Sequence, residues 1–87
     1  MARILYAEDD NQMRAFLTRA LIHAGHEVHD FPDGTSARDY FEANKNDVDL
    51  ILTDIVMPGM DGFELALHVR RARPEINTPG TFLCSQQ

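Results

Sequence analysis

The sequence has little cysteine, few basic residues and no long apolar stretch, and each of these shortages excludes some classes of protein. Cys84 is the single cysteine, so no disulfide can form within the chain, which fits a reducing compartment. Eight lysines and arginines stand against fourteen acidic residues, and this balance argues against DNA or RNA as a direct partner. No apolar run is long enough to span a bilayer, and the N-terminus turns acidic at Glu8, too soon for a signal peptide. We therefore expect a cytoplasmic protein with neither a nucleic acid nor a membrane as partner.

The composition is that of one small folded domain. With 44% apolar and 25% charged residues, the chain can form a hydrophobic core and is not of the disordered class. At 87 residues it holds one domain at most, and we expect a thin margin of stability because small domains bury a smaller share of their surface. The net charge of −6 favours a metal ion or a basic protein surface as partner.

Short apolar runs alternate with helical stripes along the chain. The expected strands are 3–7, 27–31 and 48–53. The first expected helix runs from Asp10 or Asn11 to a stop at Gly25. A second helix carries Ala37, Tyr40 and Phe41 on one face, and a third covers 62–73. Three such alternations predict right-handed βαβ units, and hence an α/β fold with a doubly wound parallel sheet. Residues 78–87 could add a short fourth strand.

Carboxylates follow the first and third of these strands. Glu8 and Asp9 close the first, and Asp54 closes the third. Ligands of open parallel sheets bind outside the carboxyl ends of the strands, so neighbouring strands would bring these three charges together. Such a cluster needs a cation, and oxygen ligands suit Mg²⁺. An aspartate beside that ion could act as a nucleophile toward phosphorus.

These residues, with their neighbours, resemble the receiver domain of two-component response regulators. The similarity rests on the pair Glu8-Asp9, on Arg14, on Leu52-Thr53-Asp54 and on the run from Met57 to Gly62 (MPGMDG). It covers about residues 1–79 and implies a flavodoxin-like sheet. Within the family, the motifs are most similar to short stand-alone receivers of the CpdR type. That similarity implies a role in alphaproteobacterial cell-cycle control, through delivery of substrates to the ClpXP protease.

The resemblance also implies roles for single residues. Asp54 would be the phosphoacceptor, with a sensor histidine kinase or histidine phosphotransferase as phosphoryl donor. The expected Mg²⁺ ligands are Asp54, Asp9, Glu8 (directly or through water) and the backbone carbonyl of Val56. Pro58 and Gly62 would shape the loop after the phosphoacceptor, and Asp10 suits an N-cap better than a metal site.

The chain also departs from the family pattern. A complete receiver has five strands, whereas this sequence ends near the fourth. We therefore expect a truncated receiver at 1–79 and an atypical tail at 80–87, either a short strand or a non-native segment. Cys84 or Ser85 falls where the family places a hydroxyl that contacts the phosphoryl group, and no residue matches the lysine of the fifth strand. An open third strand is a pairing hazard, so we expect a homodimer, domain exchange or marginal stability.

Three functions remain as hypotheses. The first is a phosphorelay module, not an enzyme, that accepts a phosphoryl group and changes its binding surface toward a protease or adaptor. The second is a phosphorylation-incompetent receiver that binds Mg²⁺ or protein partners only. The third, a phosphatase of the haloacid dehalogenase type, is poor because that chemistry needs a second aspartate where Val56 stands.

Overall fold

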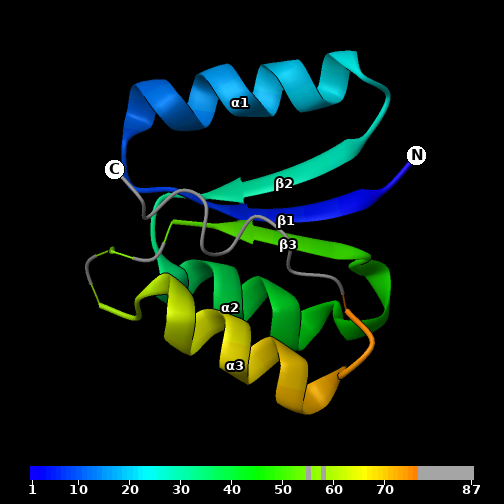
Figure 1. Cartoon of the computed structure of the whole chain (residues 1–87), viewed down its shortest axis with the longest axis vertical. Coiled ribbons are helices and arrows are strands. Elements are labelled where there is room, and N and C mark those ends of the chain that lie inside the picture. The colour runs from blue at the N-terminus through cyan, green and yellow to red at the C-terminus, as the bar shows by residue number, and fades with distance from the viewer. Residues whose placement is uncertain (55, 58, 77–87) are drawn as a thin grey trace.

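A parallel sheet with helices on both faces forms the molecule in our computed structural model, which describes residues 1–54, 56–57 and 59–76 (Figure 1). The elements, in chain order, are β1 (Arg3–Ala7), α1 (Asn11–His23), β2 (Glu27–Phe31), α2 (Gly34–Ala43), the 3₁₀ turn Lys45–Asp47, β3 (Leu50–Thr53) and α3 (Gly62–Ala72). This alternation confirms the α/β class and the three predicted strands. A fourth strand was expected within 78–87, which lies outside the described residues.

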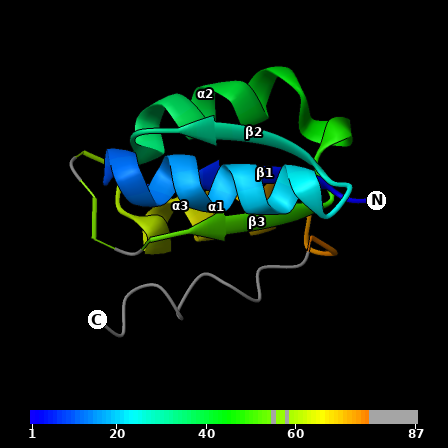
Figure 2. The same ribbon diagram turned by 90° about the horizontal axis from the view of Figure 1, so that it is seen from above.

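The sheet has the strand order β2-β1-β3, with both pairings parallel. Ile4 of β1 pairs with Val28 of β2 on one side and with Leu50 of β3 on the other. The chain therefore leaves β1 in one direction to form β2 and crosses back past β1 to form β3. Helix α1 covers one face, and α2 and α3 cover the other (Figures 1 and 2), as expected for a doubly wound sheet.

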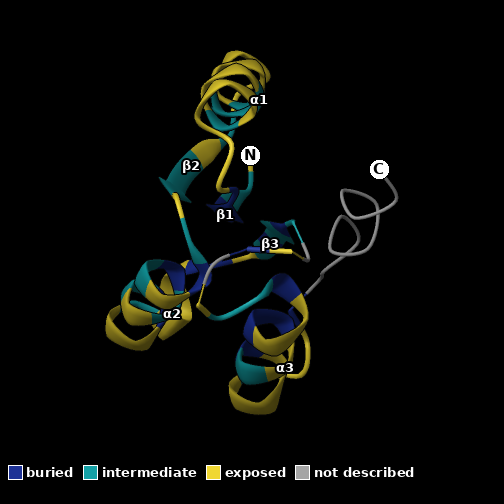
Figure 3. Ribbon diagram, turned by 90° about the vertical axis from the view of Figure 1, so that its left-hand side faces the viewer, coloured by how far each residue is buried: buried dark blue, intermediate teal, exposed yellow. Residues whose placement is uncertain are grey.

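The core lies between the sheet and the α2–α3 layer, and β1 runs through its centre. Residues 4–7 of β1 are at most 2% exposed, which explains why the strand has no charged residue after Arg3. Phe41 of α2 and Leu65 and Val69 of α3 are fully buried against the sheet. Figure 3 shows this concentration of buried residues on the inner faces of α2 and α3.

Helix α1 begins and ends as the sequence predicts. The side chain of Asp10 accepts a hydrogen bond from the Met13 amide, so Asp10 is the N-cap. At the other end, Gly25 has a φ of +97°, and the amides of Gly25 and His26 donate to the carbonyls of Ile22 and Leu21. These bonds form a Schellman motif, which requires the left-handed conformation that glycine adopts readily.

The apolar stripe of α1 is less covered than the other helices are. No residue of α1 is buried, and Phe16 is 68% exposed. Within the described parts of the chain, α1 has the outer face of the sheet to itself, whereas α2 and α3 pack against each other as well as against the sheet (Figure 3). None of the helices in those parts of the chain is both long and apolar enough to cross a membrane.

The start of β3 is the main difference from the predicted elements. The strand was expected from Val48 but begins at Leu50. Val48 follows the 3₁₀ turn, and its carbonyl accepts a hydrogen bond of 2.7 Å from the guanidinium of Arg73. Arg73, just past the end of α3, thus bonds the backbone immediately before β3.

Candidate metal and phosphoacceptor site

Three carboxylates gather where β1 and β3 end. Because these strands are parallel neighbours, the residues that follow them emerge at the same edge of the sheet. One carboxylate oxygen from each of Glu8, Asp9 and Asp54 lies within 4.8 Å of the others. The adjacency predicted from the sequence is therefore present, and it produces a concentrated negative charge.

Glu8 is the buried member of this acidic triad, at 5% exposure. Its amide donates to the carbonyl of Phe31, which continues the β1–β2 pairing, and its carboxylate accepts from the amide of Asp10 at 3.1 Å. Burial raises the pKa of Glu8, and the negative charges of Asp54 and Asp9 raise it further. A bound cation would relieve both effects.

The turn between β1 and α1 presents the two acids of the first strand. Asp10 is the N-cap of α1, as predicted, and the acidic group consists of Glu8, Asp9 and Asp54. Arg14, one turn into the helix, donates from Nη1 to the carbonyl of Glu8 at 2.7 Å and from Nη2 to Oδ1 of Asn11 at 2.6 Å. The turn is thus fixed by the helix that follows it.

Asp54 is placed by the end of β3. Its amide donates to the carbonyl of Ala7 at 3.1 Å, so the residue still pairs with β1, while its side chain is half-buried. The hydroxyl of the fully buried Thr53 donates to the carbonyl of Asp54 at 2.8 Å and lies 3.9 Å from Sδ of Met57. Buried neighbours therefore fix the backbone on which the Asp54 carboxylate stands.

The remaining predicted site residues are described only in part. Val56 is 75% exposed, and Gly62 is buried as the first residue of α3, next to the N-cap Asp61. Asp61 and Glu64 form a capping box, which fixes where that helix begins. Pro58, Cys84 and Ser85 lie outside the described residues, so their roles stay predictions, as does the role of the Val56 carbonyl.

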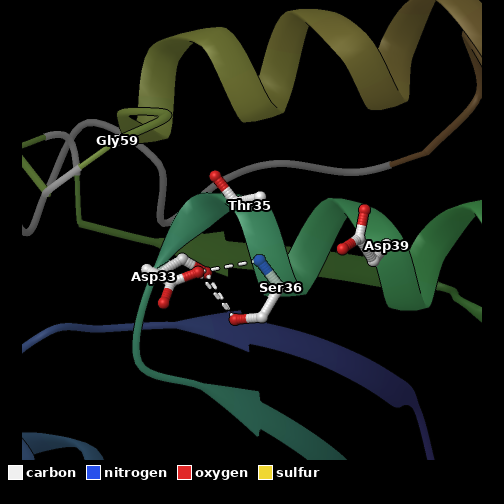
Figure 4. A pocket seen from close by; sticks show the side chains of 5 residues that line it. All are labelled: Asp33, Thr35, Ser36, Asp39 and Gly59. Carbon is white, nitrogen blue, oxygen red and sulfur yellow. Dashed lines mark hydrogen bonds between the residues drawn. The ribbon is translucent and has the colours of Figure 1, made fainter.

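The loop after β3 packs directly on the first turn of α2, a contact that the sequence did not reveal. A Cβ on Gly34 would lie 2.1 Å from the carbonyl oxygen of Met60, so only glycine fits there. Beside this contact is an open pocket of about 450 Å³, lined by Asp33, Thr35, Ser36, Asp39 and Gly59. In Figure 4 the Asp33 carboxylate turns back to cap α2 through Ser36. The pocket lining includes none of the acidic triad.

The donor chemistry of the triad fits a hard divalent cation. All three side chains offer carboxylate oxygens, the ligand type that Mg²⁺ and Ca²⁺ prefer. Asp9 is exposed and Asp54 half-buried, so water could complete the coordination of a small ion such as Mg²⁺.

The chain matches the model of the response regulator receiver domain over residues 4–85 and belongs to that family. It is 50% identical over 76 residues to the response regulator receiver protein CpdR of Brucella abortus. That match includes 87% of this chain and 62% of CpdR, so the chain spans about three-fifths of the relative's length. The resemblance to receivers, read from the acidic residues and the loop motif, is therefore confirmed.

Solved receiver structures share this fold. The response regulator TrrA of Thermotoga maritima in complex with Mg²⁺-BeF superposes with a TM-score of 0.81 at 31% identity, over 90% of this chain and 66% of TrrA. A structure of the histidine kinase ThkA in complex with TrrA also matches, with a TM-score of 0.78, the same identity and the same coverage of each chain. The arrangement of strands and helices is thus that of a receiver in two-component signalling.

Proposed function

We propose that this chain accepts a phosphoryl group on Asp54 from a phosphohistidine, in a reaction that depends on Mg²⁺. The observation that carries the proposal is the convergence of Glu8, Asp9 and Asp54 within 4.8 Å at adjoining strand ends. Further support comes from the structural similarity to TrrA, which has been solved with Mg²⁺-BeF and with a histidine kinase.

The carboxylate of Asp54 is the nucleophile. One of its oxygens attacks phosphorus, the bond between phosphorus and the imidazole nitrogen breaks, and the imidazole leaves with the electron pair of that bond. The product is an acyl phosphate on Asp54. Thr53 and the pairing of the Asp54 amide with Ala7 hold the attacking residue in place.

Glu8, Asp9 and Asp54 are the side chains that would hold the metal ion, with the Val56 carbonyl as a further ligand. When bound, Mg²⁺ neutralises the charge that builds up between the acids and the phosphoryl oxygens. The protein's own contribution is to hold the acids in place, with the buried Glu8 carboxylate accepting a hydrogen bond from the Asp10 amide. The chain is then a phosphoacceptor module and not an enzyme with a substrate of its own.

The partners follow from the same proposal. A sensor histidine kinase or a histidine phosphotransferase would supply the phosphoryl group. The 50% identity to CpdR supports a role in controlling cell-cycle proteolysis, through contact with a protease or its adaptor. Self-association through the edge of β3 is a further proposal, because that strand ends the sheet within the described residues.

The decisive experiment is the intact mass of the chain after incubation with acetyl phosphate, with and without Mg²⁺. We expect a gain of one phosphoryl group that needs Mg²⁺ and disappears in Asp54→Asn. Asp39→Asn is the matched control, because it makes the same chemical change at an exposed aspartate of α2. If a folded wild-type chain gains no mass, the alternative holds, and the protein is a phosphorylation-incompetent receiver.

A further inference from the structure

Arg14 connects the first helix to the peptide that carries the acidic pair. Its Nη1 donates to the carbonyl oxygen of Glu8 at 2.7 Å, and this carbonyl belongs to the peptide unit that joins Glu8 to Asp9. Its Nη2 donates to Oδ1 of Asn11 at 2.6 Å. The bond to the Glu8 carbonyl is partly buried, which strengthens it, whereas the bond to Asn11 is exposed.

Both acceptors are neutral, although the guanidinium lies beside a concentrated negative charge. A cation that paired with the carboxylates of Glu8 or Asp9 would compete with a metal ion for the same oxygens. Arg14 instead donates its hydrogen bonds to a backbone carbonyl and a side-chain amide, which leaves the carboxylate oxygens for another ligand. Its planar fork suits two acceptors at once, which a lysine cannot match.

From this geometry we infer that Arg14 is a positioning residue for divalent-cation binding: it orients the Glu8–Asp9 peptide so that both carboxylates face Asp54. The inference rests on the proposed function. The turn holds three further bonds, from the Glu8 amide to Phe31, from the Asp10 amide to the Glu8 carboxylate, and from the Met13 amide to Asp10. Among the hydrogen bonds of this turn within the described residues, only the one from Nη1 of Arg14 reaches the carbonyl between the two acids.

The inference can be separated from a plain effect of charge, because the two predict opposite changes. Removing a positive charge near a cation site lowers electrostatic repulsion, so by charge alone the Arg14→Met variant would bind Mg²⁺ more tightly. If Arg14 positions the acidic pair, the same variant binds more weakly, since the ligands are no longer held together. Residues that orient metal ligands typically contribute roughly ten-fold or more to affinity.

The experiment is a titration of the whole chain with Mg²⁺ alone, followed by amide chemical shifts at constant ionic strength. Circular dichroism and thermal melting establish that each variant is folded at the temperature used. We expect roughly ten-fold weaker binding in Arg14→Met and a smaller loss in Arg14→Lys, which keeps the charge but not the fork. Arg19→Met is the matched control: Arg19 is exposed on the same helix, and its loss should leave binding unchanged or slightly tighter.

Each outcome of the Mg²⁺ titration supports or overturns the inference about Arg14. Unchanged or tighter binding in a folded Arg14→Met overturns the inference, while wild-type binding leaves the proposed function intact. If Arg14→Met does not fold, Arg14→Lys decides, because affinity equal to that of the wild type would show that charge suffices. If the folded wild type binds no Mg²⁺, the Mg²⁺-dependent function fails, and the inference about Arg14 fails with it.

Discussion

Charges are paired at the amino ends of the strands, whereas like charges face one another at the carboxyl ends. At the amino end, the guanidinium of Arg3 lies 3.0 Å from the carboxylate of Asp49, whose second oxygen accepts the Arg3 amide at 2.8 Å. These bonds lower the pKa of Asp49 to about 2. At the carboxyl end, burial raises the pKa of Glu8, and the charges of Asp54 and Asp9 add to the effect.

This difference suggests a structural role for the amino ends of the strands (the amino edge) and a functional role for their carboxyl ends (the carboxyl edge). At the amino edge, opposite charges neutralise each other, so no ligand is required there. An edge that retains three acids close together, one of them buried, keeps an unfavourable arrangement that a ligand would relieve. Proteins depart from locally favourable arrangements mainly at functional sites, so the carboxyl edge is the place to look for chemistry.

The largest expected effect concerns backbone packing at the two edges. Gly34→Ala at the carboxyl edge would place a Cβ 2.1 Å from the Met60 carbonyl, and we expect a loss of about 3 kcal/mol in unfolding free energy. Gly25→Ala at the amino edge meets no atom within 4 Å, but its φ of +97° is strained for alanine, at about 1 kcal/mol. Urea denaturation measures both losses. Equal losses would contradict the expectation that a steric clash at Gly34 costs more than backbone strain at Gly25.

The next effect is the response to metal. At about ten times its Kd, Mg²⁺ should stabilise the folded chain by about 1.4 kcal/mol, because it binds the folded state only. Removal of Mg²⁺ with EDTA should reverse the gain, which thermal melting can follow. The amino edge provides the control: Asp49→Asn should respond to Mg²⁺ as the wild type does, and Asp54→Asn should not respond. A response that survives in Asp54→Asn would place the ion elsewhere.

Without metal, the same two substitutions should shift stability in opposite directions. Asp54→Asn removes one of three like charges, and we expect a gain of about 1 kcal/mol, the size of one such repulsion near 4 Å in water. Asp49→Asn removes the negative charge and one of the two oxygens that accept from Arg3, so its melting temperature should fall. Thermal melts in EDTA test the pair. A loss of stability in Asp54→Asn would mean that this carboxylate is structural.

The smallest expected effect is the pH dependence of the two edges, and its sign differs between them. The pKa of Glu8 is raised, so its contribution to stability is full below the unfolded value of 4.5 and is lost as the pH rises through the higher folded pKa. The pKa of Asp49 is lowered from 3.8 to about 2, so its contribution is full above 3.8 and is lost as the pH falls through that range.

Denaturation curves in EDTA at several pH values, compared with those of Glu8→Gln and Asp49→Asn, separate these contributions. Above the raised pKa of Glu8, the wild type should be less stable than Glu8→Gln. Its advantage over Asp49→Asn should shrink between pH 3.8 and about 2. If the wild type were more stable than both variants, or less stable than both, the contrast between the two edges would be wrong.

Much of this molecule could be predicted from local sequence patterns. The strands at 3–7 and 27–31, the N-cap at Asp10 and the stop at Gly25 each depend on neighbours within a few residues, and the structure has them all. The candidate site could be predicted as well, because parallel strands place their carboxyl ends at one edge. The bond from Arg73 to the Val48 carbonyl could not, since it joins residues 25 apart in the chain.

The sequence by itself determined the order of the elements and the identity of the three acids, because periodicity and strand ends are local features. Only the tertiary structure decided how those acids are held. The bond from Arg14 to the Glu8 carbonyl and the contact of Gly34 with Met60 depend on the direction in which helices and loops pack. Spacing along the chain cannot encode such directions, since they arise from the whole fold. The same reason explains why the apolar stripe of α1 is evident in the sequence although its exposure is not.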